Sequence, residues 1–421
     1  MSVPPGDRVL SDVADLGLAQ EGQHRIEWSE QHMPVLRDIR RRFGQERPLA
    51  GLKIGACLHV TSETANLLMT LKAGGAEIAV CACDASSTHD AVAASLVVEH
   101  EISVFARRDE ESEDYERSLV AVLDSGPNLL LDDGADLISL VHRKRPELAD
   151  EIMGGTEQTT TGVQRLRAME REDAMRFPVI AVNDSDTKRL FNNRYGTGQS
   201  TLDGIIRATN ILLAGQIVVV VGYGLAGRGV ASRAAGLGAT VIVVEVGPVR
   251  ALEALLDGNQ VMSMARAAAV GDIFITATGS KHVVNKRHFN AMKDGAIVCN
   301  CGHFDVELDL PGLRELSREH REVRPMVEEF RLLDGRRINL LGQGRLINYT
   351  AAEGHPAAVM DLSFANQALA AEVLARGSLD IGLHTLPEEL DCQVATLKLS
   401  SLGIEIDEMT EEQLEYQKSW Q

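Results

Sequence analysis

Positive charge is scarce in this chain of 421 residues. Its 42 lysines and arginines stand against 61 aspartates and glutamates, which gives a net charge of −19 at pH 7. Nucleic acid and anionic membranes would repel so acidic a protein, and we expect neither as a partner. Lysine is rarer still, with 9 copies against 33 arginines. A lysine inside a polar cluster, such as Lys188, is therefore an uncommon choice.

The chain also lacks long apolar runs and paired cysteine motifs, and we expect no signal peptide. No apolar stretch approaches the roughly 18 residues that a membrane span requires. Six cysteines are present, but the sequence does not contain the two C-x-x-C motifs that are typical of a zinc site. We therefore expect buried thiols and no bound metal. The sequence predicts a cytoplasmic protein with reduced thiols and two or three domains.

The first part of the chain alternates predicted strands and helices. The segment up to about Gly22 is polar and expected to be loosely held, and apolar residues at helical spacing follow it. These residues are Trp28, His32, Leu36, Ile39 and Phe43. Helices are expected near Ser62 and from Ala91. Strands are predicted at residues 53–60, 76–82, 128–134 and 177–184.

The most informative stretch of the chain lies at residues 216–245. The β-branched run 217–221 predicts a buried strand, and Gly222, Gly224 and Gly227 follow it in a G-x-G-x-x-G pattern. Glycines at such a turn let the backbone approach a pyrophosphate that rests on the next helix. Glu245 ends the following strand, where a carboxylate binds an adenosine ribose and repels a 2′-phosphate. The pattern predicts NAD⁺ rather than NADP⁺.

The remaining elements complete a two-domain α/β prediction. A helix at residues 201–213 leads into the glycine-rich domain, which continues through strands at 273–278, 296–301 and 337–341. We expect the helix at 360–375 to pack back on the first domain, and a short acidic helix to end the chain. The prediction is a Rossmann-type NAD domain and a discontinuous α/β substrate domain with a short C-terminal tail. The respective ranges are 191–353, 1–190 completed by 354–390, and 391–421.

Four clusters of polar residues are predicted at strand ends, where open α/β sheets bind ligands. Each cluster alone could be a helix cap, an acidic turn or a solvated lysine. Placed together before a separate NAD domain, they indicate the substrate half of an oxidoreductase. The clusters are residues 59–64, 132–136, 156–162 and 183–193.

With residues 299–309, 335–349 and 353–356, these clusters resemble S-adenosylhomocysteine hydrolases from about Arg25 onward. The resemblance is to the shorter form, without the long insertion and the C-terminal extension. It implies that tightly bound NAD⁺ oxidises the 3′-hydroxyl of an adenine nucleoside. The C5′ substituent then leaves by β-elimination, water adds and the ketone is reduced, so NAD⁺ is regenerated at each turnover. A homo-oligomer, tetramer or dimer, is also implied.

The resemblance assigns roles to single residues. Lys188, helped by Asn193, would remove the 3′-hydroxyl proton, which requires a lowered pKa. His59 and Asp133 match the acid-base pair near C4′ and C5′. Glu63 would accept a hydrogen bond from the adenine amine. Thr61 also matches an adenine contact. His303 and His355 match histidines that line the closed site. The residues that match NAD contacts are Thr159, Thr160, Thr161, Thr278, Gly279 and Asn348.

Two departures from the family pattern fall on the sugar-binding residues. Gln158 replaces a glutamate and Asn192 an aspartate, which removes two negative charges beside the atom to be oxidised. Tyr349 also stands where a smaller apolar residue lines the adenine pocket. The sequence slightly favours a retooled paralogue that eliminates or dehydrates a modified adenine nucleoside. The alternatives are ordinary reversible hydrolysis of S-adenosylhomocysteine, an inactive NAD- and nucleoside-binding regulator, and a simple dehydrogenase.

Overall fold

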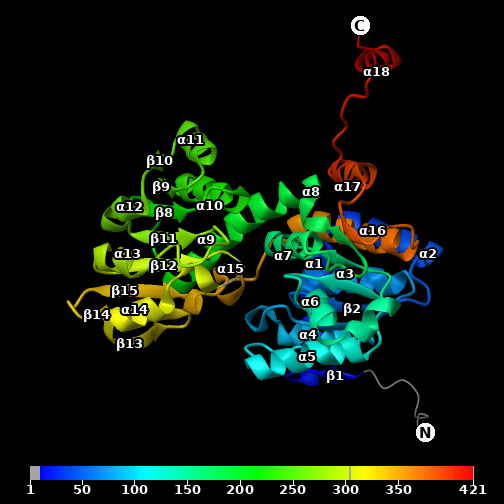
Figure 1. Ribbon diagram of the computed structural model, residues 1–421, viewed down its shortest axis with the longest axis horizontal. Helices are drawn as coiled ribbons and strands as arrows, with labels where there is room; N and C mark the ends of the chain where they lie inside the picture. Colours follow the sequence, from blue (N-terminus) through cyan, green and yellow to red (C-terminus); the bar gives the residue numbers. More distant parts are fainter. Residues whose placement is uncertain (1–9, 303–304, 421) are drawn as a thin grey trace.

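Two eight-stranded sheets organise the chain (Figure 1). The structure is a computed structural model that describes residues 10–302 and 305–420. The first sheet has the order β1-β4-β3-β2-β5-β6-β7-β16 and the second β10-β9-β8-β11-β12-β15-β14-β13. Each sheet forms its own half of the molecule, with helices on both faces, as the alternating pattern predicts.

The first sheet is parallel throughout. Its strands are β1 (Ser11–Asp12), β2 (Lys53–Cys57), β3 (Glu77–Cys81), β4 (Ser103–Phe105), β5 (Leu129–Asp132), β6 (Gly154–Glu157), β7 (Pro178–Ala181) and β16 (Gly382–His384). Its helices are α1 (Ala19–Glu30), α2 (Pro34–Glu46), α3 (Ser62–Ala73), α4 (Asp90–Val98), α5 (Ser112–Asp124), α6 (Asp136–Lys144), α7 (Thr160–Arg171), α8 (Asp186–Arg189), α16 (Ala357–Ala375) and α17 (Glu388–Ser401).

The second sheet is parallel from β10 to β15 and ends in an antiparallel hairpin. Its strands are β8 (Ile217–Val221), β9 (Thr240–Val244), β10 (Gln260–Val261), β11 (Ile273–Thr276), β12 (Ala296–Asn300), β13 (Ser317–Arg324), β14 (Val327–Leu332) and β15 (Arg337–Leu341). Its helices are α9 (Thr197–Thr209), α10 (Leu225–Gly236), α11 (Pro248–Leu256), α12 (Met264–Val270), α13 (Lys286–Ala291), α14 (Leu310–Leu316) and α15 (Ile347–Thr350).

Helix α16 returns to the first half, as the sequence predicts, and contacts α2, α3 and β6. It is buried almost all round, because it lies between the sheet and the N-terminal helices. The next helix, α17, packs against α2, α8 and α16, and it runs across residue 391, where the tail was expected to begin. The last helix, α18 (Glu411–Lys418), is exposed and extends away from the body (Figure 1).

Several predicted boundaries are wrong. The segment before Gly22 is ordered from residue 10, because Ser11–Asp12 pairs with β4. The spacing read from Trp28 to Phe43 spans two helices, because Pro34 begins α2 and forces the preceding residue out of helical geometry. Trp28 is accordingly 67% exposed, while Phe43 is buried.

The other differences are smaller. The predicted strand 53–60 ends at Cys57, and residues 58–61, which include His59 and Thr61, lie beyond the strand. The predicted helix 201–213 begins at Thr197 and ends at Thr209, because Asn210 takes a left-handed conformation with φ 55°. The β13–β14 hairpin was not predicted. No helix among the described residues is long and apolar enough to cross a membrane.

Candidate active site

The polar clusters meet at one edge of the first sheet. Strands β2, β5, β6 and β7 are neighbours and parallel, so their carboxyl ends lie side by side. A small pocket opens there, and residues 349–364 close it from the other side. Its lining includes His59, Thr61, Glu63, Asp133, Tyr349, His355, Met360 and Phe364. The structure therefore brings six residues of the sequence analysis together in one pocket.

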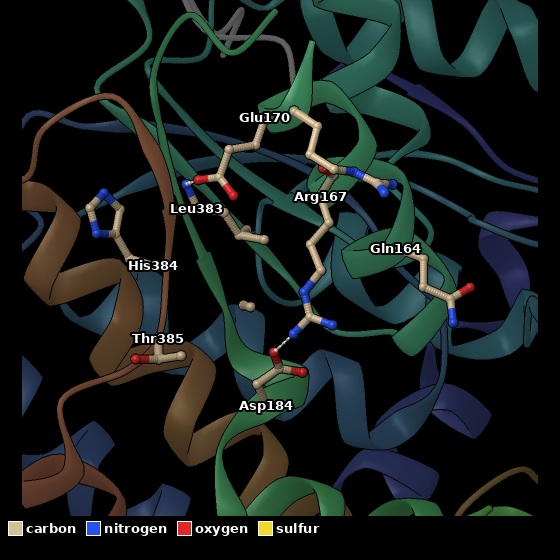
Figure 2. Close-up of a pocket in the computed structure, with 9 residues that line it drawn as sticks. Gln164, Arg167, Glu170, Asp184, Leu383, His384 and Thr385 are labelled. Atoms are coloured by element: carbon tan, nitrogen blue, oxygen red, sulfur yellow. Dashed lines mark hydrogen bonds and ion pairs between the residues drawn. The ribbon is translucent and has the colours of Figure 1, made fainter. Parts of the chain in front are cut away.

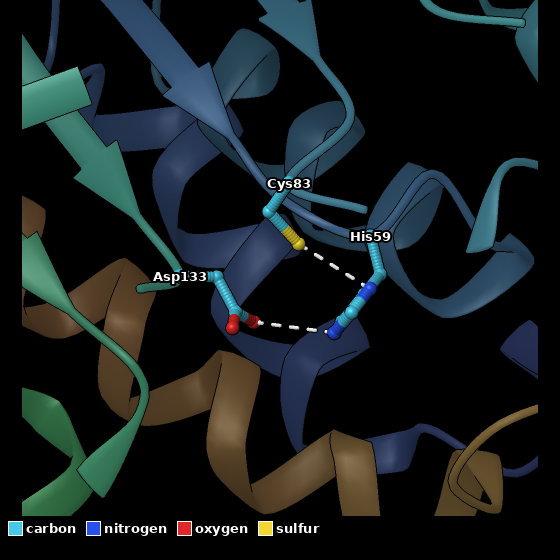
Figure 3. Close-up of side chains that lie close together, drawn as sticks. All are labelled: His59, Cys83 and Asp133. Atoms are coloured by element: carbon cyan, nitrogen blue, oxygen red, sulfur yellow. Dashed lines mark hydrogen bonds and ion pairs between the residues drawn. The ribbon is translucent and has the colours of Figure 1, made fainter. Parts of the chain in front are cut away.

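His59 and Asp133 form a pair within this pocket (Figure 3). His59 Nε2 lies 3.9 Å from Asp133 Oδ2, and both side chains are largely buried. On the other side of the ring, Nδ1 lies 2.7 Å from Ser87 Oγ and 3.3 Å from Cys83 Sγ. The Tyr349 ring stacks on His59 with the ring centres 4.0 Å apart. The imidazole is thus held on both edges and one face.

His59, Cys83 and Asp133 lie close enough together to be considered as metal ligands. Figure 3 shows Cys83 beside Nδ1 and Asp133 beside Nε2. A cation bound to either nitrogen would therefore face only one of the other two side chains, and Ser87 already occupies Nδ1. We assign no metal to this cluster.

Lys188 lies buried on the four-residue helix α8. Its Nζ donates hydrogen bonds to Asn183 Oδ1 at 3.0 Å and to Asn193 Oδ1 at 2.9 Å. Burial lowers the Lys188 pKa to about 8, although the negative charges of Asp133, Glu157 and Asp184 act in the opposite direction. The structure thus brings Asn193 to Lys188, as predicted, and adds Asn183, to which the sequence analysis gave no role.

Thr61 and Glu63 lie at the start of α3. Thr61 Oγ1 caps the helix by accepting from the Thr64 amide at 3.4 Å. The Glu63 carboxylate accepts from the Ser62 hydroxyl at 3.1 Å, and burial raises its pKa. A buried carboxylate beside the positive end of a helix is suited to accept a hydrogen bond from a ligand amine.

Gln158 and Asn192 are both buried against α16. Gln158 Nε2 donates to Gln367 Oε1 at 2.8 Å and to the Ser363 main-chain oxygen at 3.3 Å. Asn192 Nδ2 donates to Ser363 Oγ at 3.0 Å and contacts Met360 Sδ at 3.1 Å. Because both amide nitrogens are used within the protein, the amide oxygens remain as acceptors for a sugar hydroxyl.

Two buried carboxyl groups behind the pocket had no predicted role. Glu157 Oε1 accepts from the Gly134 amide at 3.0 Å and from the Thr159 amide and hydroxyl at 2.7 Å. Burial raises the pKa of Glu157, and it raises the pKa of Asp132 to about 7. The Thr159 hydroxyl, predicted to touch the cofactor, thus holds Glu157 and also caps α7 by accepting from the Gly162 amide at 2.9 Å.

The other predicted residues of this region lie nearby. The Thr160 hydroxyl donates to Asn183 Oδ1 at 3.3 Å, and Thr161 is half-buried on α7. His355 Nε2 lies 3.3 Å from Thr197 Oγ1, and burial lowers the His355 pKa to about 3, so that the ring is neutral. His303 lies outside the described residues.

The glycine turn follows β8 and leads into α10, as predicted. Gly222 has φ +100°, and a Cβ there would lie 2.7 Å from the Ala277 main-chain oxygen. A Cβ on Gly227 would lie 2.0 Å from the Gly222 oxygen, so this glycine lets helix and turn approach closely. A Cβ on Gly224 would meet nothing within 4 Å, which leaves open space at the turn.

Glu245 follows β9, at the same edge as the turn. Burial would raise its pKa, but three backbone N–H groups, including that of Tyr223 at 2.8 Å, donate hydrogen bonds to the carboxylate and lower the pKa overall. A fixed carboxylate there fits the ribose of NAD⁺ and disfavours a 2′-phosphate.

The remaining predicted NAD contacts lie across the turn. The Glu307 carboxylate fixes the Thr278 and Gly279 loop by accepting their amides at 2.9 Å and 2.8 Å. Asn348 is 2% exposed, and its Oδ1 has no hydrogen-bond partner among the residues that the structure describes. An unpartnered buried amide oxygen fits a ligand with an N–H donor, such as the nicotinamide carboxamide. These residues therefore fit the cofactor.

A more open hollow lies beside β16 and α7 (Figure 2) and contains none of the predicted site residues. Arg167 and Asp184 form an ion pair across it at 2.7 Å, and Glu170 accepts the Leu383 amide at 2.9 Å. We therefore assign the chemistry to the pocket at His59, which contains the predicted residues.

Two family models match the sequence. The model described as S-adenosyl-L-homocysteine hydrolase matches residues 11–147. The model described as S-adenosyl-L-homocysteine hydrolase, NAD binding domain, matches residues 193–354, which contain the glycine turn and Glu245. The predicted NAD cofactor and the predicted two-domain α/β class are confirmed.

Curated relatives extend the match over nearly the whole chain. The adenosylhomocysteinase of Aquifex aeolicus is 58% identical over 412 residues, which cover 97% of this chain and 99% of the relative. Those of Gloeobacter violaceus and Pyrococcus abyssi are 57% and 56% identical and cover 98% and 97% of this chain, and 97% of each relative. The predicted enzyme class is confirmed, and the chain belongs to the S-adenosyl-L-homocysteine hydrolase family.

Proposed function

We propose that this protein reversibly hydrolyses S-adenosylhomocysteine to adenosine and homocysteine. The observation that carries the proposal is the buried Lys188 amine, held by Asn183 and Asn193 at the same edge of the first sheet as the His59 and Asp133 pair. This arrangement offers one base for a sugar hydroxyl and a second acid-base pair for the neighbouring carbons. The curated relatives are named adenosylhomocysteinases, which favours ordinary hydrolysis over the retooled reaction that the sequence slightly favoured.

The chemistry begins at the 3′-hydroxyl. Gly222, Gly224, Gly227 and Glu245 would hold NAD⁺, which would supply a hydride acceptor and, at the end of the turnover, a hydride donor. Neutral Lys188 removes the hydroxyl proton. Burial lowers the pKa of this amine to about 8, so about half of it is neutral at pH 8. The two asparagine oxygens orient the amine.

The 3′-ketone makes the C4′ hydrogen acidic, so that a weak base can remove it. The His59 and Asp133 pair takes the C4′ proton and supplies a proton to the homocysteine sulfur as the C5′–S bond breaks. Water then adds its hydroxyl to C5′ and a proton returns to C4′, which balances the step. Thr61 and Glu63 are proposed to hold adenine, and Gln158, Asn192 and His355 the ribose side.

The proposal extends to the state and place of the enzyme. We propose a homo-oligomer, a tetramer or dimer, supported by the exposed Tyr416 and Trp420 on the extended C-terminal segment. Size-exclusion chromatography with light scattering tests the oligomeric state.

We also propose that the protein is located in the cytoplasm, since all six cysteines are free.

The test of the main proposal is direct. NAD-loaded protein is incubated with S-adenosylhomocysteine, and adenosine and homocysteine are quantified by mass spectrometry. Equal amounts of both products support hydrolysis. Absence of homocysteine would exclude it, and absence of any cofactor reduction as well would favour an inactive binding protein.

A second candidate function rests on Gln158 and Asn192, whose uncharged side chains contact α16 where the family has carboxylates. In that case the enzyme eliminates a C5′ group from a modified adenine nucleoside without adding water back. Loss of 18 Da from such a nucleoside would reveal the reaction. The double variant Gln158→Glu, Asn192→Asp discriminates further: it should gain hydrolysis of S-adenosylhomocysteine if the enzyme is retooled, and change it little if hydrolysis is its own reaction.

A further inference from the structure

One serine holds the His59 nitrogen that faces away from Asp133. Ser87 ends the 3₁₀ turn Ala85–Ser87 after β3 and is 1% exposed. Its Oγ lies 2.7 Å from His59 Nδ1 and 2.6 Å from the Asp84 main-chain oxygen. Neither the sequence analysis nor the proposed reaction gives Ser87 a role.

The protons in this chain of contacts can be assigned. A hydroxyl has one proton to donate, and a carbonyl oxygen can only accept, so Ser87 donates to Asp84. The side of Ser87 Oγ that faces His59 therefore offers a lone pair, and Nδ1 must carry the proton that lies between them. A neutral imidazole carries one N–H, which leaves the lone pair on Nε2.

The other neighbour of Nδ1 agrees with this assignment. Cys83 Sγ lies 3.3 Å from Nδ1, and burial raises the pKa of its thiol, so the sulfur is uncharged. An uncharged thiol is a weak donor and a weak acceptor, and it competes poorly with Ser87 for Nδ1. The opposite nitrogen, Nε2, faces Asp133 Oδ2 at 3.9 Å. A proton that arrives on Nε2 is therefore stabilised by the carboxylate.

We propose that Ser87 is a positioning residue that fixes His59 in its Nδ1–H form, so that Nε2 is the atom that exchanges a proton with the nucleoside. The role rests on the proposed function only for the identity of the nucleoside. The neighbouring Ser86 provides a matched control, because it lies in the same turn and is equally buried, but its hydroxyl donates to the Asp84 carboxylate instead of contacting His59.

The first test reads the tautomer without any substrate. Holoenzyme labelled with nitrogen-15 in its histidine rings is examined by solid-state NMR, and the variant His59→Asn identifies the His59 signals by difference. Wild type and Ser86→Ala should carry the proton on Nδ1, and Ser87→Ala should lose that single form. A wild-type ring protonated on Nε2, or an unchanged ring in Ser87→Ala, would overturn the proposal.

The second test separates the reaction steps. Adenosine is added to each NAD-loaded variant in heavy water, and nicotinamide absorbance and deuterium at C4′ are followed. Ser87→Ala should reduce its cofactor as wild type does, because Lys188 is untouched, while C4′ exchange falls by about tenfold or more. Ser86→Ala should match wild type in both.

Equal loss of both steps in Ser87→Ala, or equal behaviour of the two serine variants, would contradict a positioning role. Failure of the proposed function looks different. Wild type would then exchange the C4′ hydrogen of adenosine for deuterium, but it would release no homocysteine from S-adenosylhomocysteine. The comparison of the two serine variants would still decide the role of Ser87.

Discussion

At the scale of single residues, the proposed chemistry depends on keeping one amine, that of Lys188, neutral. Lys188 can act as a base only without its proton, and burial lowers its pKa from 10.5 to about 8. The initial rate of cofactor reduction by adenosine should therefore rise by about tenfold per pH unit below pH 8 and level off above it. Stopped-flow absorbance measures this rate, and a rate that stays flat from pH 6 to pH 9 would refute Lys188 as the base.

Glu63 should decide which base the pocket accepts. A carboxylate accepts from the amine of adenine but cannot pair with the carbonyl oxygen of hypoxanthine. Glu63→Gln should lower kcat/KM for S-adenosylhomocysteine by about 10- to 100-fold. It should also lower the ratio of this kcat/KM to that for the hypoxanthine analogue of the substrate. Ser62→Ala serves as the control, since it removes only the hydroxyl that donates to Glu63. Unchanged selectivity in Glu63→Gln would remove this residue from the adenine site.

At the scale of elements, short helix α8 is held by a residue from far along the chain. Asp391 on α17 accepts from the Asp186 amide at 2.6 Å and from the Thr187 amide and hydroxyl. Ser185, at the cap position of α8, makes no capping bond of its own. Asp391 therefore takes the place of an N-cap residue: it accepts hydrogen bonds from the first amides of α8, the helix that contains Lys188.

Asp391→Asn should lower the free energy of unfolding by about 1–2 kcal/mol, because an amide offers one acceptor oxygen and no charge. Urea denaturation of the holoenzyme measures the change. The exposed neighbour provides the control, and Glu389→Gln should leave the free energy of unfolding nearly unchanged. Equal stability of the two variants would mean that Asp391 is dispensable for α8.

The elements also explain what the sequence could and could not predict. Ends of parallel strands meet at one edge, so the clusters at His59, Asp133 and Lys188 could be placed together from strand patterns alone. Ser87 and Asp391 could not, because their roles depend on contacts with residues far away in the sequence, which leave no periodic signal. Asn183 lies within a predicted cluster, but nothing in the sequence indicates that it contacts Lys188. The end of α1 before Pro34 could have been predicted from the proline, but the helical spacing of the apolar residues favoured one continuous helix.

At the scale of the whole molecule, both halves contribute residues to the pocket. Residues of the first sheet form one wall, and Tyr349 and His355, which follow the second sheet, form the other. Ion pairs also join the two halves, with Arg345 and Asp109 3.5 Å apart and Arg25 and Glu353 3.3 Å apart. Being partly exposed, such pairs contribute about 0–1 kcal/mol each, so contacts with the enclosed ligand should matter more for bringing the walls together.

In the proposed reaction, the nucleoside transfers a hydride to bound NAD⁺ and takes it back within the same turnover. The most direct measurement counts homocysteine released per bound NAD⁺, with no cofactor added and nicotinamide absorbance recorded throughout. We predict many turnovers per bound NAD⁺ and an absorbance that reaches a low plateau and stays there. Release of one equivalent or less of homocysteine, or NADH that accumulates with time, would contradict the account.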